Sequence, residues 1–180
     1  MKKGKFSTQD ITLSAIAVVV IVLCSWLSVP TAVPFTMQSF GVILISVVLG
    51  RRQALWALLG YCLLGMIGLP VFAGFRSGIA VLAGPTGGYI LGLFAFPFII
   101  GSFSEGKQGK YQFFAAFSGL LVMYIVGTLW YSIVYTKGDV GILPALSMCV
   151  LPFIIPDIIK CILALICAKK IKKVLILVDR

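Results

Sequence analysis

The residues best suited to bind a polar ligand are Asp157 and Lys160, near the C-terminal end of the chain. Both lie in a long apolar stretch that we predict to be embedded in a membrane, where a charge costs about 2.5–3.5 kcal/mol on insertion scales. Residues three apart on a helix share one face, so the carboxylate and the ammonium can meet. Because intramembrane ionisable groups usually serve a function, we expect this pair to contact a ligand. The alternative interpretation is a structural ion pair that satisfies only itself.

The membrane prediction rests on a composition that is 61% hydrophobic and 11% charged, with a mean hydropathy of +1.13. No soluble domain of this length needs so many apolar side chains. We expect an all-α integral membrane protein whose single membrane domain, 1–180, has six transmembrane helices. The apolar runs place them at roughly 9–28, 35–49, 53–68, 85–103, 112–135 and 152–172. The first follows a lysine-rich start that is typical of signal peptides, but its apolar run is long enough to predict a retained helix.

The basic residues predict the orientation. With a cytoplasmic N-terminus, twelve of the fifteen Lys and Arg residues fall on the cytoplasmic side, and only Arg76 and Lys137 fall in outer loops. This distribution requires an even number of spans and a cytoplasmic C-terminus. Membrane topology, through the basic residues on the cytoplasmic side, is therefore sufficient to explain the net charge of +10. The basic residues are dispersed along the chain, so we expect a lipid bilayer and no nucleic acid as a partner.

The remaining residue types argue against an enzyme. The chain has no histidine, which excludes histidine-based acid–base catalysis and the common zinc motifs. Its five cysteines include no CxxC pair, so we interpret them as small packing residues and expect no metal site. The segment 101–108 reads GxxxxGKQ, but Gln108 stands where a phosphate-binding loop needs Ser or Thr. We therefore predict a short cytoplasmic turn there, and any ATP hydrolysis must come from another subunit.

Three segments rich in glycine or proline, 29–38, 68–89 and 141–156, fall on the predicted outer face. Irregular backbone at membrane depth is tolerated only where protein buries it or where it lines a cavity. Together these segments could build a pocket open to the outside. Pro156 suits the first turn of a helix, so we expect the last helix to begin near it, with Asp157 in its first turn at the floor of the pocket.

Within the second segment, Gly84, Gly88 and Gly92 are spaced four apart, as in closely packed membrane helices. Helix packing alone can explain this series. The adjacent Pro85–Gly88 cluster could instead present main-chain N–H and C=O groups to a polar ligand. Tyr89 and Phe72 offer either aromatic pocket walls or residues of the interfacial belt.

Four segments resemble the signature segments of the BioY family, the biotin-specific substrate-binding subunits (S components) of energy-coupling factor (ECF) transporters. They are VPFTMQ at 33–38, GMIGLPVFAG at 65–74, GPTGGY at 84–89 and PFIIPDIIK at 152–160. The resemblance covers roughly 8–170, and the motifs occur in the order of the family. One departure is that the first helix lacks a clean Ala-x-x-x-Ala pattern, so the residues that dock the coupling subunit are not assigned.

The resemblance implies a prokaryotic plasma-membrane protein with the S-component fold that holds biotin, as transported ligand and not as cofactor, in an outward-facing pocket. Its partners would be a transmembrane coupling subunit and two ATPase subunits, which hydrolyse the ATP. Asp157 would accept ureido N–H bonds, Lys160 would meet a ligand oxygen, and Arg76 is a candidate for the carboxylate tail. The expected substrate-binding residues are Asp157, Lys160, Gly84, Pro85, Thr86, Gly87, Gly88, Tyr89, Phe72, Gly74, Arg76, Phe35 and Gln38.

A different function class is a stand-alone secondary transporter or channel for a small carboxylate. Against it, the predicted spans hold one ionisable pair and no chain of groups to relay protons, and internal repeats, which are common in secondary transporters, are weak. A structural membrane scaffold would leave the glycine- and proline-rich segments unexplained.

Overall fold

The computed structural model describes residues 8–31, 33–103 and 109–178, and most of these are helical. The long helices are α1 (Thr8–Trp26), α2 (Gln38–Leu49), α3 (Arg51–Met66), α7 (Lys110–Leu129) and α9 (Ile154–Val178). The shorter ones are α4 (Ile79–Ala83), α5 (Gly87–Gly92), α6 (Ala95–Phe103) and α8 (Ile142–Cys149). All of them carry mostly apolar residues, whose main-chain polar groups a helix satisfies internally, as a bilayer requires.

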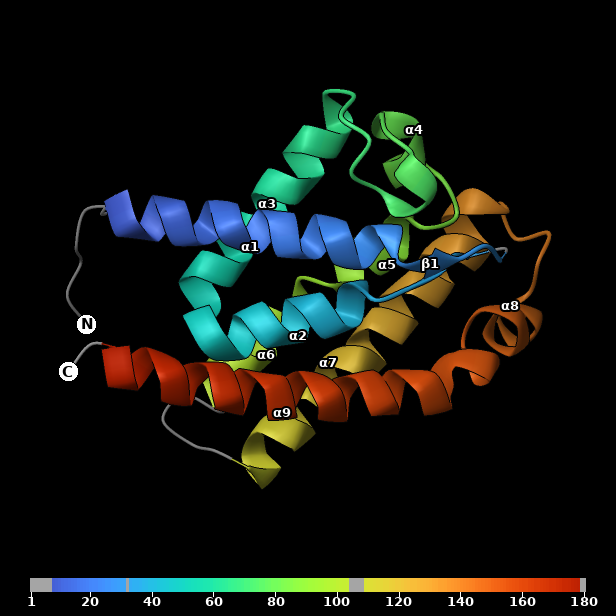
Figure 1. Cartoon of the computed structure of the whole chain (residues 1–180). Helices are drawn as coiled ribbons and strands as arrows, with labels where there is room; N and C mark the ends of the chain where they lie inside the picture. Colours follow the sequence, from blue (N-terminus) through green and yellow to red (C-terminus); the bar gives the residue numbers. More distant parts are fainter. Residues whose placement is uncertain (1–7, 32, 104–108, 179–180) are drawn as a thin grey trace.

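The segments between the helices contain short ordered elements. Strand β1 (Ser28–Val29) pairs in antiparallel fashion with β2 (Phe35–Thr36) and forms a hairpin between α1 and α2, which was not predicted from the sequence. Ala73–Phe75 and Leu151–Phe153 are single 3₁₀ turns, and Trp130–Tyr135 continues α7 as a π-helical turn. The hairpin and α8 lie at the end of the molecule away from the start of α1 (Figure 1).

Each predicted span contains helix, although the fourth is divided into α5 and α6. Thr8–Trp26, Lys110–Tyr135 and Ile142–Val174 are long and apolar enough to cross a membrane, whereas Gln38–Leu49 and Gly87–Phe103 are shorter apolar helices. The N-terminal end of α1 and the C-terminal end of α9 lie at the same end of the molecule (Figure 1). An even number of crossings gives this arrangement.

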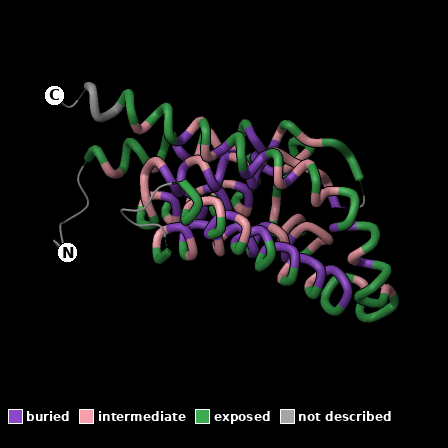
Figure 2. The backbone as a smooth tube through the Cα atoms, turned by 90° about the horizontal axis from the view of Figure 1, so that it is seen from below, coloured by how far each residue is buried: buried purple, intermediate pink, exposed green. Residues whose placement is uncertain are grey.

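The outward helix faces are apolar. Figure 2 shows buried positions where the helices face one another and exposed positions around the outside. Large side chains on the outside include Ile16, Phe114 and Ile155, which are 56%, 63% and 73% exposed. A water-soluble protein rarely presents so much contiguous apolar surface, whereas lipid tails are its natural neighbours in a membrane protein.

Glycines allow α5 to lie close against α7. A Cβ on Gly88 would fall 2.1 Å from Cβ of Trp130, and a Cβ on Gly92 would fall 2.7 Å from Cα of Met123. On α7, Gly127 leaves space for the ring of Tyr89 of α5, since a Cβ on Gly127 would fall 2.3 Å from that ring. Close helix packing is therefore sufficient to explain glycine at positions 88 and 92 of the series. This contact brings α5 and α7 together, and both helices contribute residues to a pocket in the bundle.

Helix α2 lies inside the bundle and packs against α1, α3, α6 and α9. Its Val42 and Ile43 are fully buried. Helix α9 packs closely along α2, which sets the start of α9 beside the start of α2. The first turn of α9 contains Asp157, because the helix begins at Ile154, two residues before Pro156.

Candidate ligand-binding site

A pocket lies where the three irregular segments meet the starts of α2 and α9. The empty space between its walls is about 750 Å³ when the open mouth is included. Each of the three segments contributes to the lining. The lining residues are Val33, Pro34, Phe35, Thr36, Gln38, Ser39, Tyr61, Phe72, Ala73, Arg76, Val81, Thr86, Tyr89, Ile90, Leu93, Met123, Tyr124, Cys149, Phe153, Asp157 and Lys160.

The ammonium of Lys160 is held on several sides. It forms an ion pair of 2.8 Å with Oδ1 of Asp157, and both residues are only 5% exposed. It also donates a hydrogen bond of 2.6 Å to the carbonyl of Thr36 and lies 3.3 Å from the ring centroid of Phe35. An ammonium has three N–H donors. Lys160 therefore attaches strand β2 to helix α9 as well as neutralising Asp157.

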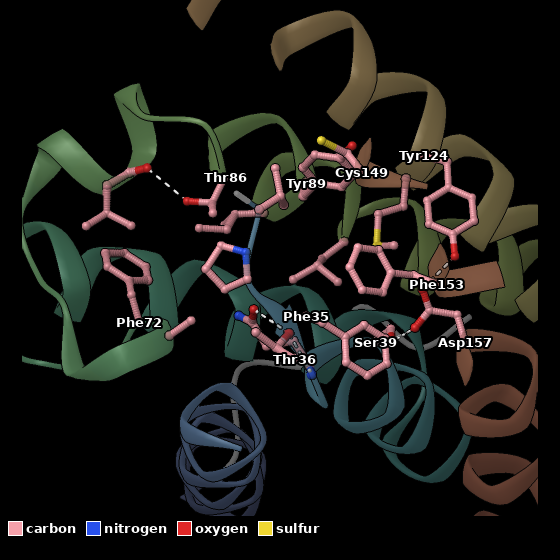
Figure 3. Close-up of a pocket in the computed structure, with 18 of the residues that line it drawn as sticks. Phe35, Thr36, Ser39, Phe72, Thr86, Tyr89, Tyr124, Cys149, Phe153 and Asp157 are labelled. Atoms are coloured by element: carbon pink, nitrogen blue, oxygen red, sulfur yellow. Dashed lines mark hydrogen bonds between the residues drawn. The ribbon is translucent and has the colours of Figure 1, made fainter. Parts of the chain in front are cut away.

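The carboxylate of Asp157 receives donors on both oxygens. The hydroxyl of Tyr124, on α7, donates to Oδ2 at 2.6 Å. The hydroxyl of Ser39, on α2, donates to Oδ1 at 3.5 Å, beside Lys160. Figure 3 shows Tyr124 and Ser39 turned toward Asp157 from different helices. A buried charge is tolerated when it is both paired and hydrogen-bonded, as this one is.

A second set of hydrogen bonds extends this polar wall toward α1 and α3. Nε2 of Gln38 donates to the Tyr61 hydroxyl at 2.7 Å, and Oε1 of Gln38 accepts from the Thr36 hydroxyl at 3.1 Å. The Tyr61 hydroxyl lies 3.1 Å from Oγ of Ser25. Because Thr36 also binds Lys160, a continuous polar row runs from α1 through α3, α2 and β2 to α9 and α7.

The rest of the lining is apolar and aromatic. Phe35 and Phe153 stack with ring centroids 4.9 Å apart and an angle of 13° between their planes. Tyr61 and Phe72 meet edge to face at 5.4 Å. Phe72 and Thr86 lie on the side of the pocket opposite Asp157 (Figure 3). The site therefore combines a row of polar groups with aromatic residues that lie both beside it, at Phe35, and across the pocket from it, at Phe72, which suits a ligand with both kinds of surface.

The structure places the residues singled out in the sequence in two groups. The first lines the pocket and comprises Phe35, Gln38, Phe72, Arg76, Thr86, Tyr89, Asp157 and Lys160. The second does not line it and comprises Gly74, Gly84, Pro85, Gly87 and Gly88. For this second group, ligand contact stays a prediction from the sequence.

The glycines outside the lining have packing, hydrogen-bonding or turn roles. Gly74 has a φ of 68°, which lets the chain turn between Phe72 and Arg76. The carbonyl of Gly84 accepts a hydrogen bond of 3.0 Å from the Trp130 indole. A Cβ on Gly87 would fall 1.8 Å from the carbonyl oxygen of Leu82. Backbone proximity is therefore sufficient to explain glycine at position 87, and the left-handed φ is sufficient at position 74.

Several lining residues were not predicted from the sequence, among them Ser39, Tyr61, Met123, Tyr124 and Phe153. Most are indistinguishable from ordinary residues of apolar helices. Tyr61 and Tyr124 carried a usable signal, because a tyrosine in the middle of a membrane helix needs a partner for its hydroxyl.

The turn predicted for segment 101–108 stays a prediction, because residues 104–108 of that segment lie outside the described residues.

An apolar helical bundle with an amphipathic, partly enclosed pocket defines a multi-pass membrane protein with a small-molecule site. The chain belongs to the BioY family, whose model matches residues 1–176, so the resemblance seen in the sequence is confirmed. That match includes the polar row and all three irregular segments.

Relatives of known description cover most of the chain. It is 43% identical over 141 residues to a "Probable biotin transporter BioY" of Pyrococcus horikoshii, which covers 78% of this chain and 81% of the relative. It is 38% identical over 155 residues to the "Biotin transporter BioY" of Thermotoga maritima, covering 85% and 89%. A third relative, "Biotin transporter BioY2" of Lactococcus lactis, is 41% identical over 157 residues, covering 84% and 83%.

The fold is also similar to a crystal structure described as the S component for biotin from an ECF-type ABC transporter. The TM-score is 0.83 at 26% sequence identity, and the match covers 94% of this chain and 95% of that one. The expected S-component fold and the all-helical membrane architecture are thereby confirmed.

Proposed function

We propose that this chain is the biotin-binding S component of an ECF-type ABC transporter and takes up biotin across a prokaryotic membrane. Family membership over residues 1–176 and the shared fold support the transport role. The observation that supports the assignment of the site is the amphipathic pocket, in which the polar row from Gln38 to Asp157 lies among apolar and aromatic residues.

Biotin has a chemical group for each part of this pocket. Its ureido group carries two N–H donors and one carbonyl acceptor, which suit the polar row. Its fused ring is apolar and fits against Phe72 and the stacked pair of Phe35 and Phe153. Its carboxylate tail suits Arg76, which lines the pocket and is exposed, and which has no ion-pair partner among the described residues. The ligand would therefore lie with its ureido end near Asp157 and its tail near Arg76.

The proposed partners are a transmembrane coupling subunit and two ATPase subunits. The related S component comes from an ECF-type ABC transporter, which supports an ATP-driven process. The stand-alone alternative has less support. The described residues hold one buried ion pair, in which Lys160 and Asp157 neutralise each other, and one pair does not form a chain of groups that could relay protons. In this scheme the present chain supplies recognition, and the partners supply energy.

Equilibrium binding of radiolabelled biotin to the purified protein tests the assignment. We expect saturable binding that unlabelled biotin displaces and that pentanoate, which copies only the tail, does not. Asp157→Asn should weaken binding at least tenfold, since a hydrogen bond to a charged group contributes about 1.5–3 kcal/mol. Asp139→Asn, at an exposed position outside the pocket lining, is the matched control. A wild-type protein that does not bind biotin would contradict the proposal.

Uptake into proteoliposomes separates the two transport classes. We expect biotin accumulation only when the coupling subunit, the ATPase subunits and ATP are present. Accumulation by this chain alone would favour the stand-alone transporter.

A further inference from the structure

We infer that Tyr124 is a positioning residue that limits how many ligand N–H groups Asp157 can accept, and that it thereby selects a neutral urea over a cationic guanidinium. The inference rests on the proposed function, because it concerns the ureido end of the pocket. The observation behind it is the contact between the Tyr124 hydroxyl and Oδ2 of Asp157, at 2.6 Å.

The contact has the geometry of a strong, directed hydrogen bond. Oxygen–oxygen distances of about 2.5–2.7 Å are typical of a hydroxyl that donates to a carboxylate. Tyr124 is 7% exposed and Asp157 is 5% exposed, so water does not compete freely for either group. The two residues lie on different helices, α7 and α9, and the bond therefore also sets how the carboxylate plane is turned.

The number of acceptor positions follows from the contacts of Asp157. An ionised carboxylate has about four lone-pair positions. Lys160 and Ser39 both donate to Oδ1, and Tyr124 donates to Oδ2. One position on Oδ2 is therefore left for a ligand. With this arrangement Asp157 accepts a single ligand N–H.

The charge around Asp157 points in the same direction. The ammonium of Lys160, 2.8 Å away, already neutralises the carboxylate. A guanidinium ligand would bring a second cation beside Lys160 and a further N–H group for which Asp157 has no free acceptor position. A urea brings no charge and presents a carbonyl oxygen, which acts only as an acceptor. The pocket wall therefore favours the neutral ligand on two separate grounds.

Removing the Tyr124 hydroxyl should reduce this preference. Tyr124→Phe keeps the ring and its packing but frees a second acceptor position on Oδ2. A carboxylate with more free acceptor capacity is a better partner for a guanidinium. The affinity for biotin should fall because Asp157 is no longer held in place, while the affinity for the guanidinium analogue should fall less or rise.

The test compares biotin with 2-iminobiotin, whose guanidinium replaces the urea, on the wild type and on Tyr124→Phe. We expect the ratio of the two dissociation constants to shift toward 2-iminobiotin by about tenfold, as expected for one hydrogen bond to a charged group. Tyr131→Phe is the matched control, because Tyr131 is a buried tyrosine of the π-helical turn that does not line the pocket. It should leave the ratio unchanged.

A second variant keeps the test decisive if Tyr124→Phe does not fold. Ser39→Ala frees an acceptor position on Oδ1 and should shift the same ratio in the same direction by a smaller factor. A purely structural role predicts that both ligands weaken equally, and that outcome would overturn the inference while leaving biotin binding intact. A wild-type protein that binds neither ligand would instead overturn the proposed function, so the two failures can be told apart.

Discussion

Lys160 donates a hydrogen bond of 2.6 Å to the main-chain carbonyl of Thr36, a residue 124 positions earlier in the chain. The same ammonium lies 3.3 Å from the ring centroid of Phe35. One side chain of α9 thus holds both residues of β2, and β2 forms part of the pocket wall. The ion pair with Asp157 therefore has an architectural role in addition to any contact with the ligand.

Replacing Lys160 with methionine should affect both stability and binding. The change releases β2 and leaves Asp157 buried without its counter-charge, and breaking a buried pair in this way costs about 3–5 kcal/mol. We expect a lower midpoint of thermal unfolding, and biotin binding at least tenfold weaker because a hydrogen bond to a charged group contributes about 1.5–3 kcal/mol. Thermal unfolding in detergent and radioligand binding measure the two effects.

Two further variants separate these effects. The double variant Lys160→Met with Asp157→Asn removes both charges and should recover most of the stability without recovering binding. Lys173→Met, at an exposed position near the end of α9, should leave both properties as in the wild type. Wild-type binding by Lys160→Met would show that β2 does not depend on this contact.

The stacked pair of Phe35 and Phe153 joins the hairpin to the turn before α9, and its loss should loosen the pocket. An aromatic pair contributes about 0.5–1.5 kcal/mol beyond the area that it buries. We therefore expect Phe153→Ala to weaken biotin binding by about tenfold, mainly through faster dissociation, which a chase with unlabelled biotin measures. Phe114→Ala, 63% exposed on the outside of α7, is the control and should not change the dissociation rate.

Arg76 should recognise the carboxylate of the ligand. If so, Arg76→Gln weakens biotin binding by about 10- to 100-fold, as for other hydrogen bonds between charged groups, but has little effect on biotinamide, which lacks the charge. Competition assays with both ligands measure the difference. Lys137→Gln, which removes the other basic residue of the predicted outer loops, is the control. Equal losses for the acid and the amide would place Arg76 away from the tail.

Gly88 should be intolerant of even a methyl group. A Cβ there would fall 2.1 Å from Cβ of Trp130 and 2.9 Å from the carbonyl oxygen of Val126, so α5 and α7 would have to separate. Overpacking of this kind costs about 1–3 kcal/mol, and we expect Gly88→Ala to lower the thermal midpoint and the yield of folded protein. Gly141→Ala, where the nearest contact is Pro144 Cδ at 3.6 Å, should be tolerated.

Features governed by local chemistry could be predicted from the sequence. The helical segments follow from runs of apolar residues, and the start of α9 near Pro156 follows from the preference of proline for a first helical turn. The proximity of Asp157 and Lys160 follows from their spacing on one helix. The packing role of Gly88 and Gly92 was one of two interpretations that their spacing allowed.

Features that depend on distant residues could not be predicted in the same way. Tyr124 and Ser39 differ little in sequence from their apolar surroundings, yet both donate to Asp157. The β1–β2 hairpin is too short to have a recognisable alternating pattern, and its place depends on Lys160, far along the chain.

The sequence by itself therefore determined that this is a helical membrane protein of the BioY family with a charged pair beside irregular, glycine-rich segments, because hydropathy, helix spacing and family motifs are properties of the chain itself. Only the tertiary structure decided which residues surround that pair and which glycines stand behind the pocket and do not line it. The physical reason is that a hydrogen-bond partner or a close helix contact exists only after separate helices pack, and α2, α7 and α9 meet around Asp157 from distant parts of the chain.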